Sequence, residues 1–172
     1  MAKTLILGGV KSGKSRLAEQ RALNSNSAVC YIATARADDS EMQQRIALHQ
    51  QQRPADWITA EVPLYLAAAL QQQDATGKCI LVDCLTLWLT NLLLADDDNL
   101  LNRETRKLLE TLPTLQADII LVSNETSMGI VPMGELTRRF CDEAGRLHQQ
   151  LAVLMDNVIL TVAGLPHFLK GN

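Results

Sequence analysis

The segment Gly8-Gly9-Val10-Lys11-Ser12-Gly13-Lys14-Ser15 has the residue types and the spacing of a phosphate-binding loop. Its first and sixth residues are glycines, which allow backbone conformations that a side chain would block, so successive N–H groups can point inward and hold phosphate oxygens. Lys14 supplies a cation for the terminal phosphates, and Ser15 supplies the hydroxyl that such loops place on Mg²⁺. The segment therefore predicts that the chain binds a nucleoside triphosphate.

The residues on either side of this loop have the patterns that the motif requires. The apolar run Leu5-Ile6-Leu7 predicts a strand that leads into the loop, and an amphipathic helix is expected over Lys14–Leu23. Average residue usage produces the same pattern by accident in about one chain of this length in two hundred. A glycine-rich turn with an exposed lysine is the alternative, and the strand and helix on either side of the loop disfavour it.

A carboxylate stands where a second group for the nucleotide would be expected. Asp83 follows the apolar run Cys79–Val82, which places it at the carboxyl end of a parallel strand, where such sheets bind ligands. It resembles a Walker-B aspartate and, with Ser15, is a candidate ligand for Mg²⁺. Capping of a helix that starts near Leu85 is the other common use of an aspartate here, and the pattern leaves both open.

A second polar pair should lie at the same edge of the sheet. The apolar run Asp118–Ser123 is followed directly by Asn124 and Glu125, so both side chains are expected near Asp83. Ligand binding and ordinary turn formation explain this pair equally well.

His49 lies in a segment with helical spacing, beside apolar residues. Met42, Ile46, His49 and Arg53 are spaced by three and four residues, which places them on one side of a predicted helix. A single histidine on an apolar face is more often packed in a core than used in catalysis. The spacing alone leaves both interpretations of His49 open.

The elements that position these residues alternate between strands and helices. Apolar runs predict strands at Thr4–Leu7, Ala28–Thr34, Lys78–Asp83, Asp118–Ser123 and Asn157–Val162. Helical spacing is found at Lys14–Leu23, Asp39–Gln52, Leu64–Gln72, Leu85–Leu94, Leu100–Leu109 and Glu135–Met155. Because the runs are continuously apolar, they fit strands covered on both faces. The alternation predicts an α/β fold with a doubly wound, mainly parallel sheet.

Composition limits the function classes. The 172 residues are 47% hydrophobic, which fits a single domain over residues 1–172. The net charge of −3 and the absence of a basic cluster disfavour nucleic acid as a partner. We expect no leader or transmembrane segment, and four cysteines without C-x-x-C spacing indicate free thiols in the cytoplasm.

Several blocks together resemble the bifunctional adenosylcobinamide kinase / adenosylcobinamide-phosphate guanylyltransferase family of cobalamin biosynthesis, over nearly the whole chain. The matching stretches are the phosphate-binding loop with Arg16, Tyr31–Thr34, Arg45-Ile46 with His49 and Arg53-Pro54, Trp57–Glu61, Asp83–Thr86 with Thr90–Leu92, Val122–Glu125 with Met128–Pro132, and Phe140–Ala152. Lys11, Gln50–Gln52 and Asp83 depart from familiar relatives, which affects nucleotide preference and not the class.

The resemblance implies a P-loop NTPase-type, RecA-like three-layer sandwich with a mainly parallel central sheet. It implies that ATP or GTP phosphorylates adenosylcobinamide and that GMP from GTP is then transferred to adenosylcobinamide phosphate through a histidine–GMP intermediate. The products would be adenosylcobinamide-GDP and pyrophosphate. By the same resemblance His49 is the guanylyl acceptor, Lys14 acts in the kinase step, and the other two histidines, His148 and His167, are not catalytic.

The resemblance also implies further nucleotide contacts and an assembly. The implied contacts are Thr34, Ala35, Arg36, Gln50, Gln51, Gln52, Arg53, Glu61 and Asp83. Relatives form homotrimers in which a neighbouring subunit can complete the corrinoid site. Two alternatives stay open, namely a chain that retains one of the two activities and a non-catalytic nucleotide-binding regulator.

Overall fold

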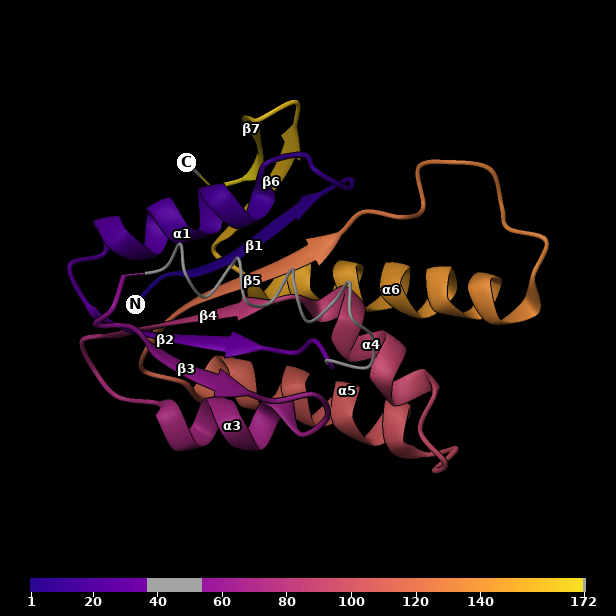
Figure 1. The fold of residues 1–172 in the computed structure, drawn as a ribbon, viewed down its shortest axis with the longest axis horizontal. Coiled ribbons are helices and arrows are strands. Elements are labelled where there is room, and N and C mark those ends of the chain that lie inside the picture. Colours follow the sequence, from indigo (N-terminus) through magenta and orange to yellow (C-terminus); the bar gives the residue numbers. More distant parts are fainter. Residues whose placement is uncertain (37–53, 172) are drawn as a thin grey trace.

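The computed structural model describes residues 1–36 and 54–171, which form a seven-stranded sheet between two layers of helices (Figure 1). The strand order is β3-β2-β4-β5-β1-β6-β7, and only the β6–β7 pair is antiparallel. The strands are β1 (Lys3–Gly8), β2 (Ala28–Ala33), β3 (Ile58–Glu61), β4 (Lys78–Asp83), β5 (Asp118–Asn124), β6 (Asn157–Val162) and β7 (Leu165–Lys170). All five strands predicted from the apolar runs are present.

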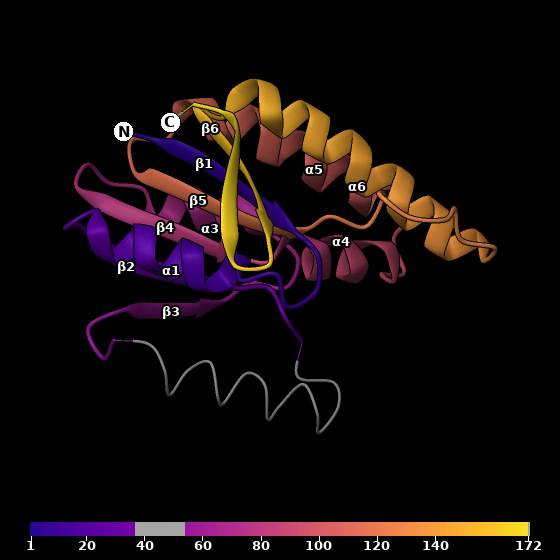
Figure 2. The same cartoon turned by 90° about the horizontal axis from the view of Figure 1, so that it is seen from above.

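The helices cover both faces of the sheet, as Figure 2 shows. One face carries α1 (Lys14–Asn24), which contacts β1, β4 and β5. The other face carries α3 (Leu66–Gln73), α4 (Leu85–Leu93), α5 (Leu100–Thr111) and α6 (Glu135–Leu154). A short 3-10 turn, Leu112–Thr114, follows α5. The predicted three-layer α/β arrangement is therefore confirmed.

Side-chain alternation along the strands divides the core into two clusters. In β4, Ile80 and Val82 face the four-helix side, whereas Cys79 and Leu81 face α1. All four side chains are fully buried, which explains why the sequence of this strand is apolar without interruption. Burial of both faces is the main stabilising contribution, and the polar residues of β4, Lys78 and Asp83, lie at its two ends.

Two strands were not predicted from the sequence. Both are edge strands, and β3 is only four residues long with mostly exposed side chains. Strand β7 is exposed along its whole length and includes Pro166, which a central strand would not tolerate. The five central strands have continuous apolar runs because their side chains are buried. Neither edge strand has such a run, since the side chains of β3 are mostly exposed and those of β7 are all exposed.

Two further expectations can be compared with the structure. Cys30, Cys79 and Cys84 are buried and Cys141 is partly buried, and all four are free thiols as predicted. Within the two described ranges, no helix is both long enough and apolar enough to cross a membrane.

Trp88 is the largest fully buried side chain of the four-helix side. Its indole Nε1 donates a hydrogen bond of 2.7 Å to the carbonyl oxygen of Leu64, just before α3. The residue thus links α4 to the segment between β3 and α3 through both packing and a directed bond. This bond also holds the connection at the carboxyl end of the sheet.

We expect Trp88→Phe to lower the free energy of unfolding by about 1–3 kcal/mol, because the smaller ring leaves a cavity and cannot donate to Leu64. Urea unfolding followed by circular dichroism measures this change. Leu94→Ala is the control, since this side chain is 64% exposed and its loss should have little effect. Equal stability of Trp88→Phe and the unaltered chain would contradict the role given to the indole.

Candidate functional site

The phosphate-binding loop joins β1 to α1, and two of its glycines, Gly8 and Gly13, are required by the local structure. Gly13 has a φ of +95°, and a Cβ at this residue would lie 3.1 Å from the Cα of Gly164. A Cβ at Gly8 would collide with the Ser12 hydroxyl and lie 2.6 Å from the carbonyl oxygen of Thr161. The loop therefore has the conformation predicted from its glycines, with the N-terminus of α1 directly behind it.

The tip of the β6–β7 hairpin supports this loop from outside. The Gly164 N–H donates a 2.9 Å hydrogen bond to the carbonyl oxygen of Ser12, and within the loop the Ser12 N–H donates to Gly9. The Ser12 hydroxyl is buried and, among the described residues, has no hydrogen-bond partner. This contact could not be predicted from the sequence, because the hairpin lies some 150 positions later in the chain.

Lys14 lies folded against the loop. Its Nζ donates a 3.0 Å hydrogen bond to the carbonyl oxygen of Gly9. Partial burial lowers the pKa of Lys14, and the negative charge of Asp83 acts in the opposite direction. The loop and Asp83 both follow the carboxyl ends of parallel strands, so they lie at the same edge of the sheet, as predicted from the sequence.

The sheet register explains this convergence. Strand β5 lies between β1 and β4, with Asn124 beside Gly8 and Val122 beside Asp83. Two strand spacings separate β1 from β4, which is about 10 Å. A phosphate chain held by the loop can therefore extend toward the Asp83 carboxylate.

Asp83 is held by a tyrosine of the neighbouring strand. The Tyr31 hydroxyl donates a 3.1 Å hydrogen bond to Asp83 Oδ2. The alternative role of Asp83 as a helix cap is wrong, since Cys84 is the N-cap residue of α4 and no side chain caps this helix. Burial raises the pKa of the neighbouring Cys84 thiol to about 11, so this thiol stays protonated near neutral pH.

Thr34, a predicted nucleotide contact, has all its polar groups occupied within the protein. Its hydroxyl accepts from the Cys84 N–H at 2.9 Å and donates to the Cys84 carbonyl oxygen at 2.6 Å. Its backbone N–H donates to Asp83, and its carbonyl oxygen accepts from the Asn91 side chain. The side chain is fully buried, so in this structure it holds the ends of β2 and β4 together.

The pair Asn124 and Glu125 lies at the predicted edge of the sheet. The Glu125 N–H donates a 2.9 Å hydrogen bond to the Gly8 carbonyl oxygen, and Glu125 Oε1 accepts from the N–H of Ser127. The Asn124 N–H donates to the Thr86 hydroxyl at 2.7 Å. Turn formation is thus one role of Glu125, and its second oxygen lies 3.9 Å from His148.

The remaining predicted residues lie farther along the same edge or outside the described ranges. Glu61 ends β3 and is exposed; four strand spacings, about 19 Å, separate β3 from β1. Arg36 is exposed and follows Ala35 at the end of β2. Glu61 is therefore not beside the phosphate-binding loop. Outside the described residues lie His49, Gln50, Gln51, Gln52 and Arg53.

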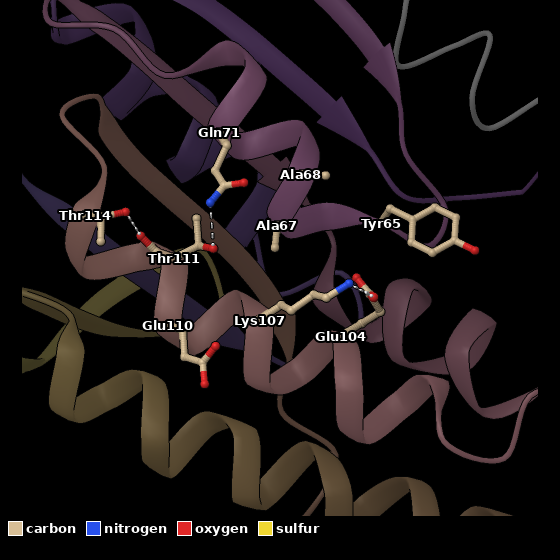
Figure 3. A pocket seen from close by; sticks show the side chains of 9 residues that line it. All are labelled: Tyr65, Ala67, Ala68, Gln71, Glu104, Lys107, Glu110, Thr111 and Thr114. Carbon is tan, nitrogen blue, oxygen red and sulfur yellow. Dashed lines mark hydrogen bonds and ion pairs between the residues drawn. The ribbon is translucent and has the colours of Figure 1, made fainter.

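A separate pocket of about 460 Å³ lies between α3 and α5, on the four-helix side (Figure 3). Glu104 is almost fully buried there and accepts a 2.9 Å hydrogen bond from Lys107. Tyr65 and Gln71 of the α3 region line the opposite wall. No residue of the phosphate-binding loop lines this pocket, and its buried carboxylate is already paired.

The sequence is similar to that of a known protein family over almost its whole length. Residues 4–169 match the family model described as cobinamide kinase / cobinamide phosphate guanyltransferase. The bifunctional adenosylcobalamin biosynthesis protein CobP of Pseudomonas aeruginosa is 60% identical over 98% of both chains. The corresponding protein CobU of Escherichia coli K12 is 38% identical over 94% of this chain and 96% of its own length.

Two solved structures share the fold at low sequence identity. The RadB recombinase superposes with a TM-score of 0.52 at 15% identity, over 92% of this chain and 73% of its own. A Pyrococcus horikoshii OT3 protein gives a TM-score of 0.54 at 9% identity, over 99% and 86%. These likenesses support the RecA-like arrangement of the sheet. The family match over residues 4–169 and the 60% identity to a full-length relative show more: the chain belongs to the cobinamide kinase / cobinamide phosphate guanyltransferase family.

Proposed function

We propose that this chain is a single catalytic domain that performs both reactions named in its family's description, on adenosylcobinamide and then on adenosylcobinamide phosphate. The observation that carries the proposal is the convergence of the phosphate-binding loop, Lys14 and Asp83 at one edge of the sheet. Such an edge orients a nucleoside triphosphate, and both reactions begin with one. The family membership supplies the acceptor molecules.

In the first reaction the hydroxyl oxygen of the aminopropanol arm attacks the γ-phosphorus of ATP or GTP. A new P–O bond forms to this oxygen, its proton is released to solvent, the bond to the β-phosphate oxygen breaks, and the nucleoside diphosphate leaves. Because the transferred group carries its charge on peripheral oxygens, catalysis depends mainly on positioning and on charge neutralisation. The loop N–H groups and the Lys14 ammonium provide both.

The residues at this edge fit a magnesium ion. Ser15 supplies a hydroxyl and Asp83 a carboxylate, which are the oxygen ligands that Mg²⁺ takes in such loops, with phosphates and water completing the shell. The described residues contain no cluster of three or more His, Cys, Asp or Glu that could hold a metal. When bound, Mg²⁺ neutralises phosphate charge. The hydrogen bond from Tyr31 restricts the orientation of the Asp83 carboxylate.

In the second reaction we assign the nucleophile to His49. A neutral imidazole nitrogen attacks the α-phosphorus of GTP, an N–P bond forms, and pyrophosphate leaves. The phosphate of adenosylcobinamide phosphate then attacks the same phosphorus and releases the histidine. Imidazole suits this step because it is nucleophilic while neutral near pH 7 and its phosphoramidate passes the nucleotide on. The support for His49 is its place in the R-I-x-x-H-x-x-x-R-P block.

The implied nucleotide contacts divide by position along the edge. Residues 8–15 and Asp83 are assigned to the phosphates. Arg36, which lies shortly after β2, and Glu61, which ends β3, are assigned to the base or the ribose. Arg53 and Gln50–Gln52 are assigned beside His49 by sequence alone. A chain with one retained activity, or a regulator that binds nucleotide without turnover, would differ from this proposal in the assays below.

The proposal includes a homotrimer that works in the cytoplasm. Four free thiols agree with a reducing compartment. Met128, Ile130, Val131 and Met133 are exposed between β5 and α6, and this apolar surface is suited to contact with a neighbouring subunit. Sedimentation equilibrium of the full chain should give three times the mass of 18.9 kDa, and a monomer at micromolar concentration would contradict the trimer.

We expect Lys14→Ala to lower kcat/KM for phosphorylation of adenosylcobinamide by at least about 100-fold, which corresponds to ~2.7 kcal/mol of lost transition-state stabilisation. The physical reason is that the terminal phosphates lose their positive partner. Radiolabelled γ-phosphate transfer measures the rate. Lys78→Ala is the matched control, because Lys78 lies at the amino end of β4, whereas the phosphate-binding loop lies at the carboxyl ends of the strands. Undiminished phosphorylation by Lys14→Ala would remove the loop from the kinase reaction.

We expect GTP labelled at the α-phosphate to leave an acid-labile GMP adduct on the unaltered chain and on His167→Ala, but not on His49→Ala. Intact-mass analysis before and after mild acid detects the adduct. His49→Ala should keep its phosphorylation activity, because the loop and Lys14 are unchanged. Absence of any acid-labile adduct on the unaltered chain would refute the proposed second reaction, and an adduct on His49→Ala would assign it to another residue.

A further inference from the structure

A chain of buried hydrogen-bonding groups connects three elements behind the phosphate-binding edge. Ser123 of β5 lies between His148 of α6 and Thr86 of α4, with Oγ 2.8 Å from His148 Nε2 and 3.4 Å from Thr86 Oγ1. Ser123 is 1% and His148 is 7% exposed. Polar groups buried this deeply stabilise a structure only when they are paired, so the arrangement is a specific constraint on how the three elements meet.

The donors and acceptors of this chain can be assigned in one direction. Thr86 Oγ1 accepts from the Asn124 N–H at 2.7 Å, so its own hydrogen is available to Ser123. Burial lowers the pKa of His148 below its usual 6.5, with Glu125 acting in the opposite direction; the imidazole is therefore mainly neutral at pH 7. The Glu125 carboxylate, 3.9 Å from Nδ1, favours the tautomer with its proton on Nδ1. Nε2 then accepts from Ser123.

The row of side chains Ser123, His148 and Glu125 resembles the catalytic triad of a serine hydrolase. The surroundings of these side chains exclude hydrolytic catalysis. A nucleophilic hydroxyl must reach a substrate, and the Ser123 side chain is closed off between α4, α6 and the sheet. The consequence lies instead at Asn124, the last residue of β5, and at Glu125, which follows it. Asn124 is held by Thr86, and the Glu125 N–H donates to the Gly8 carbonyl oxygen at the start of the phosphate-binding loop.

We propose that Ser123 and His148 are positioning residues for the kinase reaction: they fix the carboxyl end of β5, with Asn124 and Glu125, between the phosphate-binding loop and Asp83. This rests on the proposed function for its catalytic consequence. Ser123 and His148 are buried and have no role in contacting substrate. They act through the backbone of β5, whose register places Asn124 beside Gly8 and Val122 beside Asp83. Loss of the bond would let this strand end shift relative to the phosphates.

The test uses the full chain and four variants. Ser123→Ala removes the hydroxyl with little change of volume, and His148→Leu removes both ring nitrogens. His148→Gln keeps a polar group near the position of Nε2 and should restore the bond to Ser123. His167→Gln is the matched control, because His167 lies on the exposed strand β7. Circular dichroism identifies variants that fail to fold; if His148→Leu is among them, Ser123→Ala decides the question.

Two measurements are made on each folded variant. Hydrogen exchange should show the Asn124 and Glu125 amides exchanging at least about tenfold faster in Ser123→Ala and His148→Leu, with Leu5–Leu7 still protected. The kcat of adenosylcobinamide phosphorylation should fall at least about tenfold while KM for ATP changes less than about threefold. His148→Gln and His167→Gln should remain within about threefold of the unaltered chain in both measurements.

Unchanged exchange at Asn124 and Glu125 would overturn the proposal whatever the activity. Accelerated exchange with unchanged kcat would also overturn it, because the strand end would then move without affecting catalysis. Failure of folded His148→Gln to restore kcat would exclude the Ser123 bond as the cause. If the unaltered chain does not phosphorylate adenosylcobinamide, the proposed function fails separately, and the exchange data alone decide whether the pair fixes the strand end.

Discussion

The hydrogen-bonded register of β1, β5 and β4 is the constraint on which the candidate site depends. It places Asn124 beside Gly8 and Asp83 beside Val122, so the loop, the end of β5 and the carboxylate stand side by side at one edge. A slip of one residue in either pairing would turn every side chain to the other face of the sheet. Both faces of these strands are buried, so a slip would disrupt the side-chain packing of both clusters and draw polar residues from the strand ends into the core.

Hydrogen bonds at the strand ends add to the stabilisation that the apolar core provides. Thr34 connects the ends of β2 and β4, Tyr31 orients Asp83, and Ser123 connects β5 to α4 and α6. Each hydroxyl group is buried or nearly so and is paired within the protein. The core therefore determines which strands are neighbours, whereas these bonds determine how precisely their carboxyl ends are aligned. Catalysis by positioning depends on that alignment.

The parts of the site that could be predicted from sequence are those whose chemistry is local. Gly8–Ser15 form one continuous segment, and Asp83 follows directly on an apolar strand. Thr34 with Cys84, and Ser123 with His148, are separated by 50 and 25 positions, and no spacing rule connects such pairs. Only tertiary packing brings them together, so the sequence predicts neither the bonds between Thr34 and Cys84 nor the bond between Ser123 and His148. The edge strands β3 and β7 were missed for a related reason, since they contain no continuous apolar run.

The contact between Gly164 and Ser12 has a consequence for the order in which the molecule is made. The phosphate-binding loop is synthesised first, but its strand lies between β5 and β6 and its outer side rests on a hairpin near residue 164. During synthesis, residues 3–8 therefore cannot pair with β5 and β6 until more than a hundred further residues have been made. Long-range parallel pairing of this kind folds slowly, and nascent chains should acquire nucleotide affinity only after the β6–β7 hairpin has emerged.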